Sequence, residues 1–313
     1  MEPPEGKNIS FLIKERAREL GFDLCGFAPS GILSEHESRL KTWCSEGMNG
    51  DMAYLARNIE KRINPDFLVP GAKSIIVTGL NYYSERQQGG NGVPVISRYA
   101  YGTNYHDVIK EKLDLLIDFI KIQNPEAEAR SFVDSAPLLE KAWAKEAGLG
   151  WPGRHSILIN KSIGSFFFIG IIVVTIRLDY DNPSVEDHCG ECRLCIESCP
   201  TAAINENRTI DVRKCIAYLT IESKTPATVA QAEKFGGRVF GCDKCQEVCP
   251  WNARAKRHTV AEFEMNKELK EMTTEDWLQL TPAKFKELFR KSAIGRRKYH
   301  RFMETVELVS KNM

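Results

Sequence analysis

The middle of the chain contains a dense cysteine motif, CGECRLCIESCP, at residues 189–200. Its four cysteines are separated by two, two and three residues, and a proline follows the last one. This spacing is that of bacterial ferredoxins, in which three closely spaced thiolates hold one [4Fe–4S] cube and the fourth thiolate binds another. The motif therefore predicts a ferredoxin-like region with two iron–sulfur clusters.

A second cysteine motif, CDKCQEVCP at residues 242–250, repeats the end of the first but lacks its first cysteine. Cys215 is the nearby thiol that can complete a second set of four. The crossed ligation of two-cluster ferredoxins then predicts two closed sites. The first cluster takes Cys189, Cys192, Cys195 and Cys249, and the second cluster takes Cys199, Cys215, Cys242 and Cys245.

The alternative metal is zinc, which also binds four thiolates. Zinc ribbons typically use paired CxxC knuckles, so the spacing here favours iron–sulfur clusters. Disulfides are not expected, because eight of the ten cysteines crowd into residues 189–249 of a chain that we expect to be cytoplasmic, where thiols stay reduced. Cys25 and Cys44 receive no chemical role, since free cysteines are mostly small buried hydrophobic residues.

The composition is that of an ordinary globular protein. The chain has 313 residues, a formal net charge of +1, 42% hydrophobic and 27% charged residues, which excludes a disordered tail, a collagen-like repeat and a disulfide miniprotein. Residues 1–10, MEPPEGKNIS, lack a secretory signal and a twin-arginine pair. The longest apolar run, residues 166–176, is too short to span a bilayer. We therefore expect a cytoplasmic protein that does not enter a membrane.

Three regions are expected along the chain: residues 1–180 with mixed helices and strands, residues 181–255 with the clusters, and residues 256–313 with short helices. The first region combines helical periodicity with apolar runs typical of covered strands. The patterns that carry this prediction lie at residues 12–20 and 108–122 for helices and at 74–79, 157–160 and 166–176 for strands.

The last region contains a strongly basic stretch. Residues 284–301 hold eight Lys or Arg against one acidic residue, Glu287. Four aromatic residues are interleaved with these charges, namely Phe285, Phe289, Tyr299 and Phe302. The pattern suits a surface that attracts a phosphate backbone. The alternative is a solvated basic helix face whose aromatic residues belong to the core.

One glycine motif is not interpreted as a dinucleotide site. Residues 148–153, GLGWPG, match G-x-G-x-x-G, but that fingerprint must follow a strand and open a helix. The preceding residues 138–147 are strong helix formers. The glycines are therefore predicted to end a helix and form a turn.

Several motifs outside the cysteine runs resemble one known family. They are SRYAYG at residues 97–102 with Tyr105 and His106, FVDSAPLLE at 132–140, AGLGWPGRHSILIN at 147–160 and CIAYLTIE at 215–222. Together with the first cysteine motif they resemble epoxyqueuosine reductase over roughly residues 8–255. The resemblance implies a cobalamin-dependent enzyme with two [4Fe–4S] clusters. Its reaction would remove the epoxide oxygen from epoxyqueuosine at the tRNA wobble position, giving queuosine and water.

The resemblance also implies a fold. We expect an α+β protein with a mixed α/β cobalamin-binding domain related to reductive dehalogenases, a ferredoxin-like two-cluster domain and a short helical C-terminal segment. Many relatives continue into a helical-repeat domain that helps to grip tRNA. In this chain residues 256–313, and residues 284–301 in particular, are the candidate tRNA contact, and binding through phosphates would weaken steeply with salt.

Individual roles follow from the same resemblance. Asp134 matches the catalytic acid that lies over the cobalt face and protonates the departing oxygen. An aspartic acid suits this role if burial or a nearby negative charge raises its pKa; the alternative is that Asp134 caps the following helix. Arg57 matches a corrinoid contact. Other positions at or near the corrinoid are Ser97, Leu158, Ile169, Ala217, Lys224 and Asp243.

The expected cofactors and partners complete the hypothesis. The D-x-H-x-x-G motif that supplies a histidine to cobalt in many corrinoid enzymes is absent from the sequence, so the resemblance implies base-off cobalamin. The expected partners are tRNA carrying epoxyqueuosine and an external low-potential electron donor, and the protein is expected to be a monomer. The alternative function is a reductive dehalogenase-like reaction on a small molecule. A plain electron carrier or a non-enzymatic tRNA-binding protein would explain only part of the chain.

Overall fold

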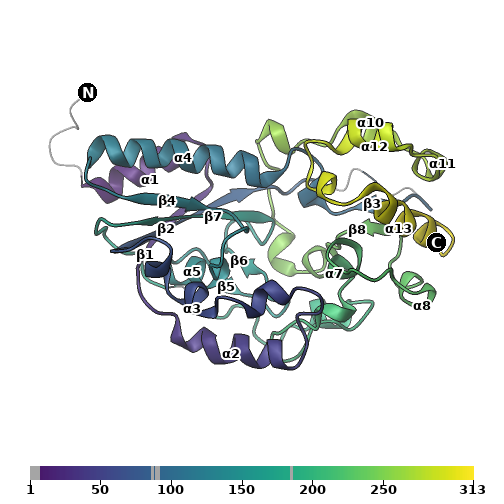
Figure 1. The fold of residues 1–313 in the computed structure, drawn as a ribbon, viewed down its shortest axis with the longest axis horizontal. Helices are drawn as coiled ribbons and strands as arrows, with labels where there is room; N and C mark the ends of the chain where they lie inside the picture. The colour runs from purple at the N-terminus through teal and green to yellow at the C-terminus, as the bar shows by residue number, and fades with distance from the viewer. Residues whose placement is uncertain (1–7, 86–87, 89–91, 184–185) are drawn as a thin grey trace.

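The computed structural model describes residues 8–85, 88, 92–183 and 186–313. Its first part is built on a four-stranded antiparallel sheet with the strand order β1-β2-β7-β4 (Figure 1). The strands are β1 (Leu24–Pro29), β2 (Ser74–Asn81), β4 (Ala129–Phe132) and β7 (Phe167–Val174). β2 and β7 pair along their whole length, from Ser74 opposite Val174 to Asn81 opposite Phe167.

Helices cover both faces of this sheet (Figure 1). α1 (Ile9–Glu19) and α4 (Tyr105–Gln123) pack on one face, and α5 (Glu140–Glu146) packs on the other. Neighbouring residues of β2 alternate between the two cores, with Ile76 on the α1/α4 side and Ile75 on the α5 side. Two covered faces explain why every residue of β2 is buried.

The helices α1 and α4 and the strands β2 and β7 confirm the patterns at residues 12–20, 108–122, 74–79 and 166–176. The predicted strand at 157–160 shortens to β6 (Leu158–Ile159), which pairs with β5 (Trp151–Pro152). The glycine motif is a helix end and a turn as predicted, since α5 ends at Glu146 and Gly148 has a φ of +74°.

The remaining α-helices span four to twelve residues each. The other helices are α2 (Ser34–Ser45), α3 (Ile59–Ile63), α6 (Leu194–Glu197), α7 (Ile216–Ile221), α8 (Val229–Ala232), α9 (Lys244–Glu247), α10 (Lys267–Glu271), α11 (Thr274–Leu278), α12 (Pro282–Phe289) and α13 (Tyr299–Ser310). Two further strands, β3 (Val95–Ile96) and β8 (Arg238–Phe240), pair in parallel. α6 and α9, which carry cysteines of the two motifs, pack against each other.

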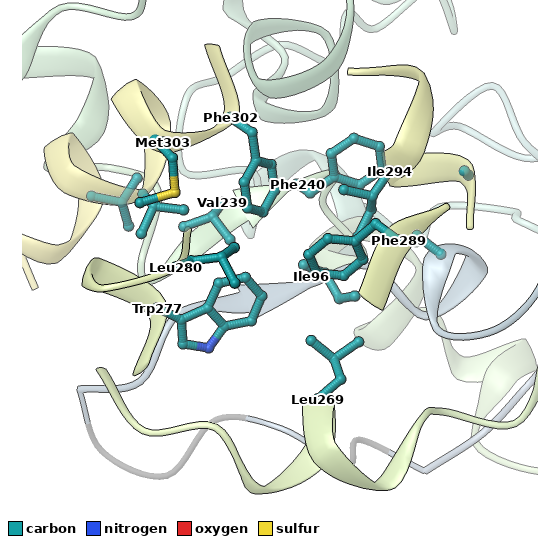
Figure 2. Packing of buried hydrophobic residues seen from close by; sticks show 14 of the residues in the cluster. Ile96, Val239, Phe240, Leu269, Trp277, Leu280, Phe289, Ile294, Phe302 and Met303 are labelled. Atoms are coloured by element: carbon teal, nitrogen blue, oxygen red, sulfur yellow. The ribbon is translucent and has the colours of Figure 1, made fainter. Parts of the chain in front are cut away.

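The C-terminal helices share a hydrophobic core with earlier parts of the chain. Figure 2 shows Trp277 of α11, Phe289 of α12 and Phe302 of α13 beside Ile96 of β3 and Phe240 of β8. Residues from all three predicted regions therefore meet in one core, and the division at residues 180 and 255 stays a prediction.

The aromatic residues of the basic stretch belong to this core. Phe285, Phe289 and Phe302 are buried, and half-buried Tyr299 donates a hydrogen bond to the Leu280 carbonyl at 2.6 Å. The interpretation of these aromatics as core residues is confirmed, so they are not free to stack on nucleic-acid bases.

The structure also bears on the prediction that no segment of the chain spans a membrane. Among the described residues, no helix combines the length and the apolar character needed to cross a bilayer. Residues 1–7, which contributed to the expectation of a cytoplasmic protein, lie outside the described residues.

Candidate active site and cluster sites

A cavity of about 720 Å³ opens between the end of the sheet, α7 and the segment that leads into α13. Tyr105 and His106 reach it from the first turn of α4, and Asp134 reaches it from the loop after β4. Cys215 lines it from the residue before α7. The start of α4 and the loop after β4 thus bring polar side chains to the space that Cys215, a predicted cluster ligand, borders.

Asp134 adopts an uncommon backbone conformation at this cavity. Its φ is +53°, in the left-handed region that non-glycine residues rarely occupy and that is found repeatedly at functional sites. Its side chain is 59% exposed. Asp134 Oδ2 accepts a hydrogen bond from the Tyr105 hydroxyl at 2.7 Å and lies 3.5 Å from His106 Nε2. The surrounding structure therefore fixes the carboxylate in the cavity.

The capping alternative for Asp134 is wrong. α5 begins at Glu140, its N-cap is Leu139, and no side chain caps it. The chain makes a loop between Asp134 and the helix, so the Asp-Ser-Ala-Pro sequence does not start a helix here.

The condition named for the acid role, a raised pKa at Asp134, is not met in the described structure. The hydrogen bond from His106 and that from Tyr105 favour the charged carboxylate and lower the pKa of Asp134. The carboxyl group whose pKa is raised is instead that of Glu140, which accepts a hydrogen bond from the Asp134 backbone N–H. Burial, and the Asp134 carboxylate beside it, raise the pKa of Glu140 to about 8. The pKa values of the two neighbouring carboxyl groups are thus shifted in opposite directions, which is typical of acid and base pairs in active sites.

Basic side chains surround the mouth of the cavity. Arg296, Arg297, Lys298 and Arg301 line it from the C-terminal segment, and Lys224 lines it from the chain after α7. Arg296 and Lys298 are exposed, whereas Arg297 donates to the Ile221 carbonyl at 2.6 Å. Part of the basic stretch thus faces the cavity and is available to an anionic ligand.

The cavity fits a large cofactor. Its volume lies within the range of about 300–1,000 Å³ that is usual for ligand sites, and Met52, Ile221 and Phe240 give it an apolar wall. The Nε atom of Arg297 is buried without a hydrogen-bond partner in the described structure. An apolar wall with an unpaired donor suits a corrinoid, whose flat ring carries amide groups. Both nitrogens of His106 already face other side chains, Asp134 at 3.5 Å and Asn104 at 3.0 Å.

The predicted corrinoid contacts separate into two groups. Asp134, Ala217 and Lys224 line the cavity. Arg57, Ser97, Leu158, Ile169 and Asp243 are not among its lining residues. Leu158 and Ile169 belong to the core beneath α5, Arg57 is exposed, and Ser97 and Asp243 are buried.

Asp243 and its surroundings have a clear structural role. Its Oδ2 accepts from the backbone N–H of Arg98 at 2.9 Å and from the Arg98 guanidinium at 3.1 Å. Ser97 lies beside Gly241, where an added Cβ would come within 2.3 Å of the Ser97 hydroxyl. These contacts join the segment after β3 to the second cysteine motif.

The structure brings together the four cysteines of the predicted first cluster. They line a separate cavity of about 270 Å³ with Arg154, His155, His188 and Trp251 among its other walls. Burial, and the neighbouring thiols of Cys189, Cys249 and Cys192, raise the pKa of Cys195. One cavity therefore holds three thiols of the first motif and the last thiol of the second.

The other four cysteines form a second neighbourhood. Burial, and the thiols of Cys242 and Cys215, raise the pKa of Cys245, and Cys199 contributes to the raised pKa of Cys215. Cys195 also acts on Cys245, so the two neighbourhoods adjoin. Among the described residues, no set of three or more His, Cys, Asp or Glu side chains is arranged to hold a single metal ion.

Sequence reasoning missed two residues of these sites. Glu140 ends the FVDSAPLLE motif and His155 lies in the AGLGWPGRHSILIN motif, but only the fold shows what they contact. His155 is buried with an unpaired Nε2, and burial lowers its pKa to about 4, so its ring is neutral. The motifs that carried the resemblance could have drawn attention to both residues.

Comparisons with known proteins identify similar sequences and structures. Residues 62–135 match the family model described as epoxyqueuosine reductase QueG, DUF1730, and residues 188–252 match a 4Fe-4S double cluster binding domain. The chain is 47% identical to an epoxyqueuosine reductase from Cellulophaga algicola over 93% of this chain and 94% of the relative. The second match favours [4Fe–4S] clusters over zinc at the eight cysteines.

Two solved structures place the fold. An epoxyqueuosine reductase crystallised with an epoxyqueuosine-modified tRNA-Tyr stem loop superposes with a TM-score of 0.89 at 30% identity, over 96% of this chain and 80% of that one. A reductive dehalogenase described as B12-dependent gives a TM-score of 0.52 at 19% identity, over 86% of this chain and 35% of that one. The α+β fold related to reductive dehalogenases is confirmed.

Proposed function

Because the chain belongs to the epoxyqueuosine reductase family of oxidoreductases, we propose that it reduces epoxyqueuosine to queuosine at the wobble position of tRNA. The reaction takes up two electrons and two protons and releases one water. The site must therefore combine an electron route, a proton donor and a surface for RNA. The observation that carries the proposal is that Asp134, Cys215 and a group of basic side chains border one cavity.

The proposed electron route uses the two groups of cysteines. Cys189, Cys192, Cys195 and Cys249 would hold one [4Fe–4S] cluster, and Cys199, Cys215, Cys242 and Cys245 the other. Cys192 is exposed, which suits the first cluster as the entry point for an external low-potential donor. Cys215 borders the large cavity, which suits the second cluster as the one that delivers electrons there.

The proposed cofactor of the large cavity is base-off cobalamin. When bound, cobalamin supplies the strongly reducing centre that epoxide opening requires. Ala217 and Lys224 would contact it from α7 and the chain after it, and Asp134 from the loop after β4. For Arg57, Ser97, Leu158, Ile169 and Asp243, contact with cobalamin stays a prediction, because they do not line the cavity.

Asp134 is the proposed proton donor to the departing oxygen. Its lowered pKa means that the carboxylate is ionised at rest, so it must be loaded with a proton during the reaction. His106 Nε2 lies 3.5 Å from Asp134 Oδ2 and is suited to supply that proton. Tyr105, whose pKa burial and Asp134 raise, stays protonated and holds the carboxylate in place.

The proposed tRNA contact is the C-terminal region, residues 256–313. Arg296 and Lys298 are exposed at the mouth of the cavity, where they can meet phosphates next to the modified base. We also propose that the protein works as a cytoplasmic monomer, divided at residues 180 and 255 into cobalamin-binding, cluster-binding and tRNA-contacting parts.

The test is an anaerobic assay of cluster-reconstituted protein with cobalamin, a strong reductant and tRNA that bears epoxyqueuosine. Mass spectrometry of the digested nucleosides should show loss of one oxygen only when cobalamin is present. Asp134→Asn should keep both clusters and the bound corrinoid but lose turnover. Full turnover by Asp134→Asn would refute the proton-donor role. Bound cofactors without any tRNA product would point to the alternative, a reductive reaction on a small molecule.

A further inference from the structure

His155 occupies a fixed position beside the first cysteine group. It lies in the turn between β5 and β6, and its side chain is 3% exposed. The backbone N–H of Ile157 donates to His155 Nδ1 at 3.2 Å. A Cβ on Gly153 would lie 2.9 Å from His155 Cε1, so the ring uses the space that this glycine leaves open. Both contacts hold the imidazole in one orientation.

The same contacts determine the tautomer. Because Nδ1 accepts a hydrogen bond, the single proton of the neutral ring is on Nε2. The Nε2 atom is buried and has no hydrogen-bond partner in the described structure. A buried donor without an acceptor is uncommon and indicates an acceptor that the protein itself does not provide.

His155 lines the 270 Å³ cavity together with Cys189, Cys192, Cys195 and Cys249, so a group that fills this cavity would lie against the ring. His188 also lines this cavity, but its Nε2 faces Glu186 at 3.4 Å. Arg154 lines it too and is held through another nitrogen by the Gly190 carbonyl at 2.7 Å, with its Nε unpaired. His155 is therefore a buried donor at this cavity whose Nε2 has no partner in the described structure.

We propose that the Nε2–H of His155 donates a hydrogen bond to a sulfur of the [4Fe–4S] cluster at these four cysteines and thereby raises the reduction potential of that cluster. The inference rests on the cluster site of the proposed function and is independent of the epoxide chemistry. One-electron reduction makes the cluster more negative, and a fixed N–H donor stabilises the more negative state more strongly. By raising this potential, His155 makes it easier for the external donor to reduce the cluster.

The test compares the wild-type chain with His155→Leu, which removes the donor at similar volume, and His155→Asn, which keeps an N–H. Each full-length protein is reconstituted anaerobically, and EPR-monitored redox titration gives the potentials of both clusters. His155→Leu should lower the equilibrium constant for reduction of one cluster about tenfold, which is about 59 mV for a one-electron couple. His155→Asn should stay within about threefold of wild type. The second cluster serves as the internal control and should not change.

Unchanged potentials in His155→Leu, or equal shifts of both clusters, would overturn the inference. If His155→Leu fails to assemble its cluster, pulsed EPR of the reduced wild-type protein with ¹⁵N-labelled histidine decides instead. A weak histidine ¹⁵N coupling that disappears in His155→Asn supports the bond, and its absence from wild type refutes it. Normal potentials without turnover of epoxyqueuosine would reject the proposed reaction alone, whereas a wild-type chain that takes up no iron would reject both.

Discussion

Replacing Glu140 by Gln should make the protein more stable above neutral pH. Glutamine keeps the oxygen that accepts the Asp134 N–H but cannot ionise. In the folded protein the pKa of Glu140 is raised from 4.5 to about 8 by burial and by Asp134. Between these two values the folded chain keeps a proton that the unfolded chain has released, so stability falls as the pH rises through this window.

The measurable part of this effect lies between pH 6.5 and 8. Below pH 6.5, His155 acts in the opposite direction, because its folded pKa is lowered to about 4 and the unfolded ring takes up a proton first. Above pH 6.5 that contribution levels off as the unfolded ring loses the rest of its proton. One pKa unit corresponds to about 1.4 kcal/mol, so Glu140 accounts for a loss of about 2 kcal/mol over this interval. For a chain of this length that is a fall of about 3 °C in Tm.

The assay is thermal unfolding of the anaerobic, cluster-loaded protein at several pH values from 6.5 to 8. The Tm of Glu140→Gln should decline less than that of wild type by about 3 °C over this range. Glu287→Gln is the matched control, since Glu287 is 66% exposed and should follow wild type. If the plots of Tm against pH for wild type and Glu140→Gln run parallel, the raised pKa of Glu140 is refuted.

Three other predictions follow from the sites and the core. Phe302→Ala removes a ring that is 1% exposed and should destabilise the protein by about 3–5 kcal/mol in denaturant titrations; a loss below about 1 kcal/mol would contradict the shared core. The double variant Arg296→Ala and Lys298→Ala should weaken tRNA binding. The slope of log Kd against log salt should fall by the amount expected for the loss of about two phosphate contacts, and an unchanged slope would contradict a phosphate contact. Cys192→Ser should lower the iron content and block electron entry while cobalamin still binds, whereas Cys215→Ser should also disturb the bound corrinoid spectrum; identical spectra in both variants would contradict the position of the second cluster beside the cavity.

The sequence was informative wherever spacing along the chain encodes contact. The two cysteine motifs predicted that Cys189, Cys192, Cys195 and Cys249 share one cavity, because cluster ligation imposes the spacing directly. The covered strands were equally accessible, since a strand buried on both faces is mainly apolar. β7 is apolar throughout, and β2 is apolar except for Ser74, Thr78 and Asn81.

The electrostatics of Asp134 could not be predicted in the same way. Its pKa depends on Tyr105 and His106, which lie almost thirty residues earlier and meet it only because the start of α4 and the end of β4 lie side by side. The sequence pattern alone suggested a helix cap, but a loop of several residues separates Asp134 from α5. The tautomer of His155 likewise depends on one backbone N–H, that of Ile157, which no motif specifies.

The basic stretch shows why its two interpretations were not exclusive. The helical period of α13 turns Phe302 and Val306 into the core, while Arg301 and the residues just before the helix face the cavity. One segment therefore builds the hydrophobic core and the mouth of the site at once. Because the aromatic side chains hold the backbone that presents the cations, the position of the charges over the cavity is fixed by packing. The proposed substrate contact at this edge would thus depend on the stability of the shared core as much as on charge.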